Sequence, residues 1–265
     1  MPSTASVERA AITARKQAAR KIVSDRLRLL PYESIADQSR TVADTIRKLP
    51  EYQDARNIGL YMHMEVSTSV PRKSGRSVEV QTDLMIQNAF EDGKSVFLPR
   101  IVPDSELTHG LKDLFYKTLS HQQDSSESIF TPKSFLKMLK MPDYASVAEL
   151  KTENDAHSFI IREPPTENED AFEGDGLDII IVPGLVFNES CDRIGRGKGF
   201  YDTYIGLHNA WSDARENASK PLLVGIALRE QIIQRLESES ELPREEHDQI
   251  LDILVVESDI HRRRR

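Results

Sequence analysis

The amino-acid sequence predicts a three-layer α/β fold, in which a largely parallel, open sheet carries helices on both faces. Two observations predict it. Short apolar runs rich in β-branched residues alternate along the chain with stretches of helical periodicity, a pattern typical of parallel sheets connected by helices. The runs are also apolar at nearly every position, as in residues 177–182, so their strands are expected to be buried on both faces.

The N-terminal part of the chain contains clear helix and strand boundaries. Pro31 and Pro50 each follow an amphipathic stretch and are expected to end a helix there. Asp92-Gly93 is a turn signal that ends a third helix. The expected elements are helices over 6–30, 34–49 and 82–91 and strands over 57–62 and 95–100.

Two segments interrupt this pattern and are expected to be insertions. Residues 65–77 are basic and lack periodicity, and residues 103–134 are weakly patterned, with a polar stretch over 121–128 that is typical of a mobile loop. We therefore expect one domain over 1–260, followed by a solvated basic tail at 261–265. The remaining expected elements are strands over 135–141, 177–182, 222–228 and 250–256 and helices over 200–209 and 229–236.

Composition argues against several classes of protein. A net charge of −8 disfavours non-specific nucleic-acid binding, which needs an extended basic surface. No apolar run approaches the length of a transmembrane helix, so we expect no membrane span. The single cysteine, Cys191, excludes an internal disulfide and fits a reducing compartment. These features favour a monomer that acts on small molecules.

The N-terminal segment has two interpretations. Residues 1–30 are rich in Arg, Ala and Ser and poor in acids, which is the composition of a mitochondrial transit peptide. The same segment has helical periodicity in Ala19, Val23 and Leu27, which favours a helix of the mature protein. We prefer the second interpretation and expect a cytoplasmic protein, with a mitochondrial location as the alternative.

The most distinctive stretch is residues 193–199, where cations and glycines alternate. Glycines let the backbone approach a ligand, a helix beginning near Phe200 adds the positive end of its dipole, and Lys and Arg side chains neutralise negative charge. The spacing matches neither a P-loop nor a dinucleotide fingerprint. A solvated basic loop is the alternative, but the buried strand before it places the cations at the carboxyl end of a sheet. We predict a polyphosphate site.

Other candidate groups are less specific alone. Lys16 and Arg20 lie four residues apart on one helix face and could contact phosphates, or simply form a solvated basic face. Asp202 directly after the loop and Asp248 before the last strand suit Mg²⁺, which is usually bound by one or two carboxylates plus substrate phosphates. A helix-start carboxylate and a turn residue are the alternatives for these two.

At these residues the chain resembles the 5-formyltetrahydrofolate cyclo-ligases, also called methenyltetrahydrofolate synthetases. The resemblance rests on residues 183–187 and 193–202 and covers most of the chain apart from the two insertions. It implies that Arg196 and Lys198 act on the transferring phosphoryl group. The implied ATP contacts in the loop are Arg193, Ile194, Gly195, Arg196, Gly197, Lys198, Gly199, Phe200 and Tyr201, and the implied substrate contacts there are Arg196, Gly197, Lys198, Gly199 and Phe200, where Phe200 replaces the more usual Tyr.

The resemblance also implies roles outside the loop. Lys16 and Arg20 match a basic pair that contacts ATP in the family, and Asp202 and Asp248 match its Mg²⁺ carboxylates.

On the folate side, Met62 matches an apolar contact and Glu79 matches the family's folate-binding glutamate. Glu65 fits the same short pattern nearer the strand. We prefer Glu79 because a helix follows it directly.

The resemblance implies a reaction as well. The family converts 5-formyltetrahydrofolate to 5,10-methenyltetrahydrofolate, with ATP as co-substrate and Mg²⁺ as cofactor, and releases ADP and phosphate. Two alternatives remain open from the residues alone. One is another ATP-dependent small-molecule kinase, and the other is a regulator that binds folate or nucleotide without turnover. The presence of both Lys198 and Asp202 ranks the regulator last.

Overall fold

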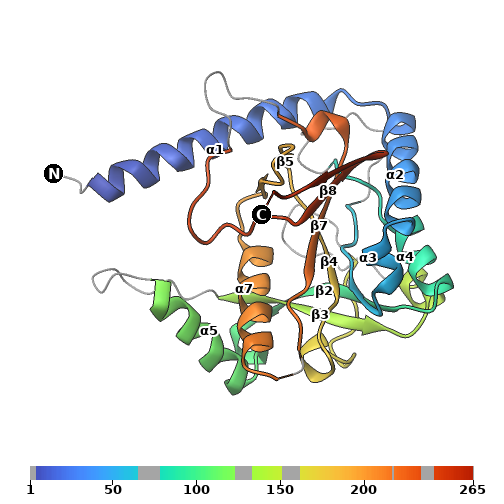
Figure 1. Ribbon diagram of the computed structural model, residues 1–265, viewed down its shortest axis with the longest axis vertical. Coiled ribbons are helices and arrows are strands. Elements are labelled where there is room, and N and C mark those ends of the chain that lie inside the picture. Colours follow the sequence, from blue (N-terminus) through green and yellow to red (C-terminus); the bar gives the residue numbers. More distant parts are fainter. Residues whose placement is uncertain are drawn as a thin grey trace.

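The computed structural model describes residues 4–64, 78–122, 133–150, 162–216, 218–233 and 242–264. Within these ranges a seven-stranded sheet has the order β3-β2-β1-β4-β7-β8-β9 (Figure 1). Its strands are β1 (Asn57–Gly59), β2 (Ser95–Pro103), β3 (Ser134–Met141), β4 (Ile179–Val182), β7 (Leu222–Ala227), β8 (Ile253–Val256) and β9 (Asp259–Arg262). None of the described helices is long and apolar enough to cross a membrane.

The sheet is parallel in its centre and antiparallel at its edges. Strands β2, β1, β4, β7 and β8 pair in parallel, while β3 and β9 are antiparallel to their neighbours. The chain passes from β1 to β2 on one side and later adds β4 on the other side. The carboxyl ends of β1 and β4 therefore form a topological switch point, where open α/β sheets bind ligands.

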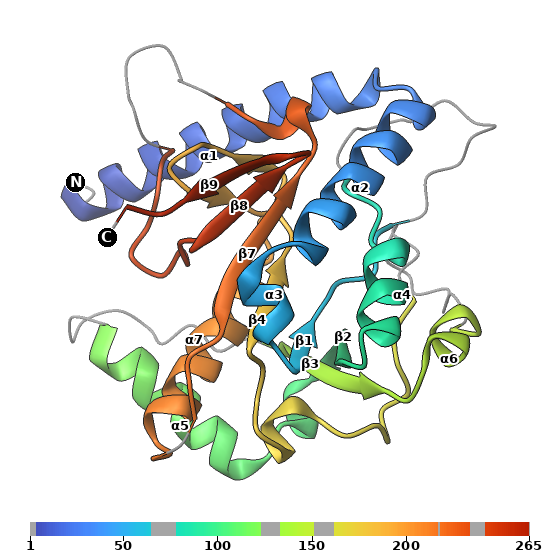
Figure 2. The same ribbon diagram turned by 45° about the vertical axis from the view of Figure 1, so that its right-hand side comes forward.

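Both faces of the sheet are buried, as the continuous apolar runs predicted. In β4, Ile179 and Ile181 belong to one apolar cluster, whereas Ile180 and Val182 belong to another. The first cluster includes residues of α1 (Thr4–Arg28), α2 (Tyr32–Arg47) and α4 (Asp83–Glu91), and the second includes residues of α5 (His109–Gln122) and α7 (Phe200–Asp213). Figures 1 and 2 show α2 and α4 on the opposite side of the sheet from α5 and α7. The predicted three-layer α/β fold is confirmed.

Several short elements differ from the prediction. Pro50 ends α2 as expected but also begins α3 (Pro50–Asp54), because proline suits the first turn of a helix. The helix expected over 229–236 is wrong at its start, where only the 3₁₀ turn η4 (Arg229–Gln231) forms; residues 234–241 lie outside the described residues. The other short elements are α6 (Tyr144–Ala148), η2 (Asp104–Glu106) and η3 (Ala171–Glu173).

The segment over 103–134 was expected to be an insertion without regular structure. Its first half instead contains a helix, α5, that packs into the fold. This helix packs on α7, and its Phe115 is buried with its ring edge-on to Phe135 of β3, at 5.1 Å between centroids. The helix was missed because its apolar positions are few and lie beside polar low complexity. The insertion predicted over 65–77, and residues 123–132 of the second one, lie outside the described residues.

The basic tail expected at 261–265 is also corrected. His261 and Arg262 belong to β9, where they pair with Leu254 and Ile253 of β8. The Arg262 guanidinium forms an ion pair with Glu51 of α3. The end of the chain therefore adds an edge strand to the sheet.

A buried histidine of α7, His208, is hydrogen-bonded to the backbone just before β4. The His208 Nε2 atom accepts a hydrogen bond from the Leu177 N–H at 3.0 Å, and Gly176 leaves space for the ring, since a Cβ there would lie 3.0 Å from Nε2. Burial lowers the pKa of His208 to about 4. The neutral ring is therefore the native form.

This depressed pKa predicts a loss of stability on acidification. The stabilisation is complete above the unfolded-state pKa of about 6.5 and decreases as the pH falls towards the folded-state pKa of about 4. Between pH 7 and pH 4.5 the free energy of unfolding should fall by about 2 kcal/mol through this group. Urea unfolding at the two pH values measures the change. In His208→Gln the pH-dependent part should shrink, and an equal pH-dependence in that variant would contradict the assignment.

Candidate active site

The chain between β4 and α7 forms a hairpin rather than the simple loop expected. Strands β5 (Val186–Phe187) and β6 (Arg193–Ile194) pair antiparallel. Gly184 permits the turn into this hairpin, because a Cβ there would lie 2.4 Å from the Phe187 ring. The hairpin brings residues 193–199 back to the carboxyl edge of the sheet, beside the switch point.

Two of the glycines in this stretch are required by the backbone. Gly197 has φ +99° and Gly199, the N-cap of α7, has φ +71°. Side chains rarely adopt these angles, so glycine is the residue that fits. Cys191, in the hairpin turn, also has a positive φ of 69°. Its thiol is buried and burial raises its pKa to about 11, which makes it an unreactive bystander.

Three cations of the predicted site pair with carboxylates, two of them with carboxylates from distant segments. The pairs are Arg193 Nη2 with Asp202 Oδ1 at 2.6 Å, Arg196 Nη2 with Glu79 Oε2 at 2.8 Å, and Lys16 Nζ with Glu245 Oε2 at 2.7 Å and Asp248 Oδ2 at 2.5 Å. Buried charges need such partners. The side chains of Arg193, Glu79 and Lys16 are exposed by only 3%, 4% and 9%. The structure therefore gathers these predicted residues around one loop.

Helix α1 covers the loop from the other side. The Arg20 Nε–H donates to the Gly195 carbonyl at 2.8 Å, so Arg20 of the predicted basic pair contacts the loop, while Lys16 pairs with Glu245 and Asp248. Lys198 is exposed and forms no ion pair with any residue of the described ranges. A cavity of about 540 Å³ between α1 and the loop is lined by Gln17, Arg20, Lys21, Ser24, Asp25, Arg196 and Gly197. Its volume and its cations suit a nucleotide-sized anion.

The predicted folate residues lie at the end of β1. Met62 is buried, and the Glu79 Oε1 atom accepts the Met64 N–H at 2.9 Å. Glu79 thus accepts a hydrogen bond from Arg196 with one carboxylate oxygen and a hydrogen bond from the Met64 backbone, in the segment after β1, with the other. Glu65, the alternative, lies outside the described residues.

Hydrogen bonds join residues 61–64 to residues 79–82. The Tyr61 hydroxyl donates to the Val80 carbonyl, the Thr82 hydroxyl donates to the Tyr61 carbonyl, and the Thr82 N–H donates to His63 Nδ1. Both ends of the predicted insertion at 65–77 are therefore fixed to each other.

Two buried polar atoms of the basic segment lack a hydrogen-bond partner among the described residues. They are the Arg193 Nε and the Tyr201 hydroxyl. Burial raises the pKa of the Tyr201 hydroxyl well above its usual value, and the nearby Glu79 carboxylate raises it further, so the group stays protonated and able to donate. Such unsatisfied groups are expected where a ligand completes a site.

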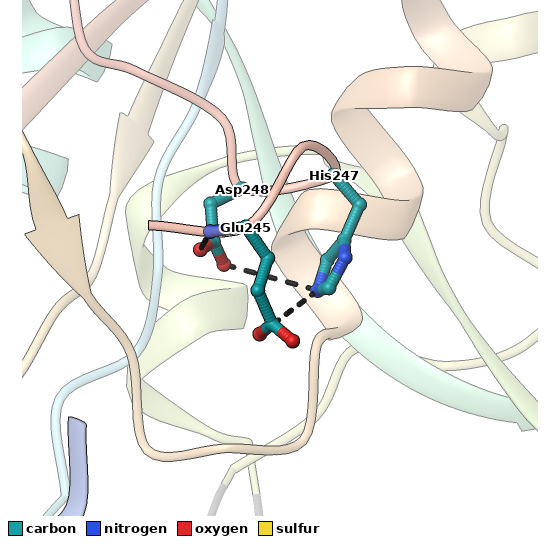
Figure 3. Close-up of side chains that lie close together, drawn as sticks. All are labelled: Glu245, His247 and Asp248. Carbon is teal, nitrogen blue, oxygen red and sulfur yellow. Dashed lines mark hydrogen bonds and ion pairs between the residues drawn. The ribbon is translucent and has the colours of Figure 1, made fainter. Parts of the chain in front are cut away.

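Carboxylate oxygens are the ligands that Mg²⁺ prefers, and the predicted pair fits it chemically. The Asp202 Oδ1 atom accepts the N–H of Gln249, the residue after Asp248, so the two carboxylates belong to touching segments. Asp248 also groups with Glu245 and His247, with ligand atoms within 4.8 Å of one another (Figure 3). Sequence reasoning missed Glu245; its only signal was its position in the acidic run before Asp248.

The fold and the site define an α/β protein with a glycine-rich cationic loop at the switch point of a parallel sheet, a place suited to a polyphosphate. Residues 12–257 match the family model of the 5-formyltetrahydrofolate cyclo-ligase family. The chain belongs to this family, which confirms the resemblance predicted from residues 183–202.

Relatives and a solved structure agree with this assignment over nearly the whole chain. A probable 5-formyltetrahydrofolate cyclo-ligase of Schizosaccharomyces pombe is 30% identical over 242 residues, 91% of this chain and 94% of that protein. The 5-formyltetrahydrofolate cyclo-ligase of Saccharomyces cerevisiae is 30% identical over 243 residues, 91% and 95% of the two chains. The NMR structure of Aquifex aeolicus 5,10-methenyltetrahydrofolate synthetase shares the fold, with a TM-score of 0.55, 21% identity and coverage of 94% and 93%.

The buried pair of Arg193 and Asp202 predicts a stability effect. Asp202→Ala leaves the guanidinium buried without its partner and should lower the free energy of unfolding by about 3 kcal/mol. Asp213→Ala, on the same helix, removes only an exposed pair with Lys220 and should cost less than about 1 kcal/mol. Denaturant unfolding of both variants checks the contrast, and equal losses would contradict it.

Proposed function

We propose that this protein catalyses the ATP- and Mg²⁺-dependent cyclisation of 5-formyltetrahydrofolate to 5,10-methenyltetrahydrofolate, with release of ADP and phosphate. Membership of the family supports the reaction, and the observation that carries it to this chain is the geometry of the basic loop. Arg20 contacts the loop beside a cavity that Arg196 also lines, Lys16 lies one helical turn away and pairs with Asp248, and Glu79 pairs with Arg196.

The chemistry explains why such a site needs no protein nucleophile. The formyl oxygen is a poor leaving group, so it attacks the γ-phosphorus of ATP and ADP leaves. N10 of the folate then attacks the activated carbon, phosphate departs, and N10 loses its proton. Each step needs alignment of the reactants and neutralisation of charge.

The residues divide this work. Arg196 and Lys198 stabilise the charge on the transferring phosphoryl group, and Lys16 and Arg20 orient the polyphosphate from α1. Asp202 and Asp248 would hold Mg²⁺, which supplies further neutralisation of the phosphate oxygens when bound. Glu79 binds the folate and orients Arg196 through the ion pair at 2.8 Å.

We infer a cytoplasmic monomer. The single reduced cysteine supports that compartment, and the N-terminal helix supplies Lys16 and Arg20 to the site, which supports its role in the folded protein.

The direct test follows absorbance of the methenyl product with purified protein, 5-formyltetrahydrofolate, Mg²⁺ and ATP, against controls that lack each. A rise that needs all three supports the proposal. ATP consumption without methenyl product would favour another small-molecule kinase, and folate binding without turnover would favour a regulator.

Lys198→Ala tests the role of the loop within this assay. Because Lys198 is exposed and unpaired among the described residues, its loss should leave the melting temperature unchanged while kcat falls by roughly 100-fold or more. Lys220→Ala, which changes an exposed lysine between α7 and β7 that pairs with Asp213, is the matched control and should retain full activity. Full turnover in Lys198→Ala would overturn the assigned role.

Glu79→Gln tests the folate contact and decides between the two candidate glutamates. Loss of a charge-assisted hydrogen bond should raise KM for the folate by about tenfold, with KM for ATP less affected. Glu65→Gln should leave both constants unchanged. The reverse result, with the folate KM raised only in Glu65→Gln, would transfer the assignment to Glu65.

A further inference from the structure

The segment before β8 contains a carboxylate to which the proposed reaction gives no role. The Glu245 Oε2 atom lies 2.7 Å from Lys16 Nζ, and the Glu245 N–H donates to Asp248 Oδ2 at 2.7 Å. Figure 3 shows its side chain beside Asp248. Glu245 therefore contacts both the lysine assigned to ATP and one of the carboxylates assigned to Mg²⁺.

Asp248 pairs with Lys16 and is also proposed to bind Mg²⁺, and one carboxylate oxygen cannot do both well. Its Oδ2 atom lies 2.5 Å from the Lys16 ammonium, and a carboxylate that turns towards a divalent cation weakens its pairing with lysine. The Lys16 side chain is only 9% exposed, so the ammonium needs a counter-charge. Glu245 is the second anion in contact with it among the described residues.

Of the other charged groups nearby, the Arg244 guanidinium is engaged elsewhere, whereas His247 Nε2 also lies 3.9 Å from Asp248. The Arg244 guanidinium lies 3.6 Å from Asp192. The His247 Nε2 atom is 4.0 Å from Glu245 and its side chain is 62% exposed. An ammonium offers three donors, and two of those of Lys16 point to Glu245 and Asp248, which leaves one for a phosphate oxygen.

We propose that Glu245 is a positioning residue that keeps the Lys16 ammonium in place when Asp248 binds Mg²⁺. The proposal rests on the proposed function, which assigns ATP to Lys16 and the metal to Asp248. Without Mg²⁺, Asp248 and Glu245 hold Lys16 together. With Mg²⁺, Glu245 takes over, so its contribution to ATP binding depends on the metal.

The test measures equilibrium binding of ATP by calorimetry with and without Mg²⁺, in the absence of folate. Mg²⁺ should increase the ATP affinity of the wild type. In Glu245→Gln this gain should fall by about tenfold, between the effects of an exposed and a buried ion pair. Glu246→Gln changes the same charge at the exposed next residue and should behave as the wild type.

Two further variants separate positioning from a merely structural role. In a Lys16→Met background, Glu245→Gln should cause no additional loss, because the two residues act as one unit. Glu245→Asp keeps the charge and should restore most of the gain, which keeps the test valid if Glu245→Gln folds poorly. An unchanged gain in Glu245→Gln, or an equal loss in both backgrounds, overturns this proposal alone. A wild type that does not bind ATP overturns the proposed function and this proposal with it.

Discussion

Charge compensation between distant segments is the constraint on which this site depends. The cations that suit a polyphosphate come from α1 and from the hairpin after β4, and Lys16 and Arg196 are each held by a carboxylate from a distant part of the chain. Arg196 and Glu79 are 117 residues apart, and Lys16 and Asp248 are 232 apart. Without these anions, the cations would repel one another around the cavity. The folded chain thus keeps a cationic site in a protein of net charge −8.

The same pairing explains how the site can be preorganised before a ligand arrives. A cation held by a carboxylate loses little conformational entropy when a phosphate approaches, because its side chain is already ordered. The cost is competition between the carboxylate and the phosphate for the same charge. The site contains cations of two kinds. Arg193 is of the first kind: its side chain is only 3% exposed and is paired with Asp202. Lys198 is of the second kind: it is exposed and accessible to a ligand.

Local signals in the sequence were enough to predict the central strands and the basic loop. Continuous apolar runs identified β4, β7 and β8, and the alternation of cations with glycines identified the loop, because both depend on neighbouring residues. The β5–β6 hairpin depends instead on contacts such as Phe187 over Gly184, and α5 depends on packing against α7. The contact of Glu245 with Lys16 joins residues 229 apart. No local pattern reports such contacts.

The hydrogen bonds between residues 61–64 and 79–82 have a consequence for engineering and for divergence. They close the chain at the base of the intervening segment, so the two residues proposed to contact folate, Met62 and Glu79, lie at its two ends. Lengthening a closed loop costs little, about 0.6 kcal/mol for each doubling of its length. We therefore expect this position to accept extra residues, such as an affinity tag or a fluorescent reporter, because the hydrogen bonds that hold Glu79 come from residues on either side of it or distant in sequence.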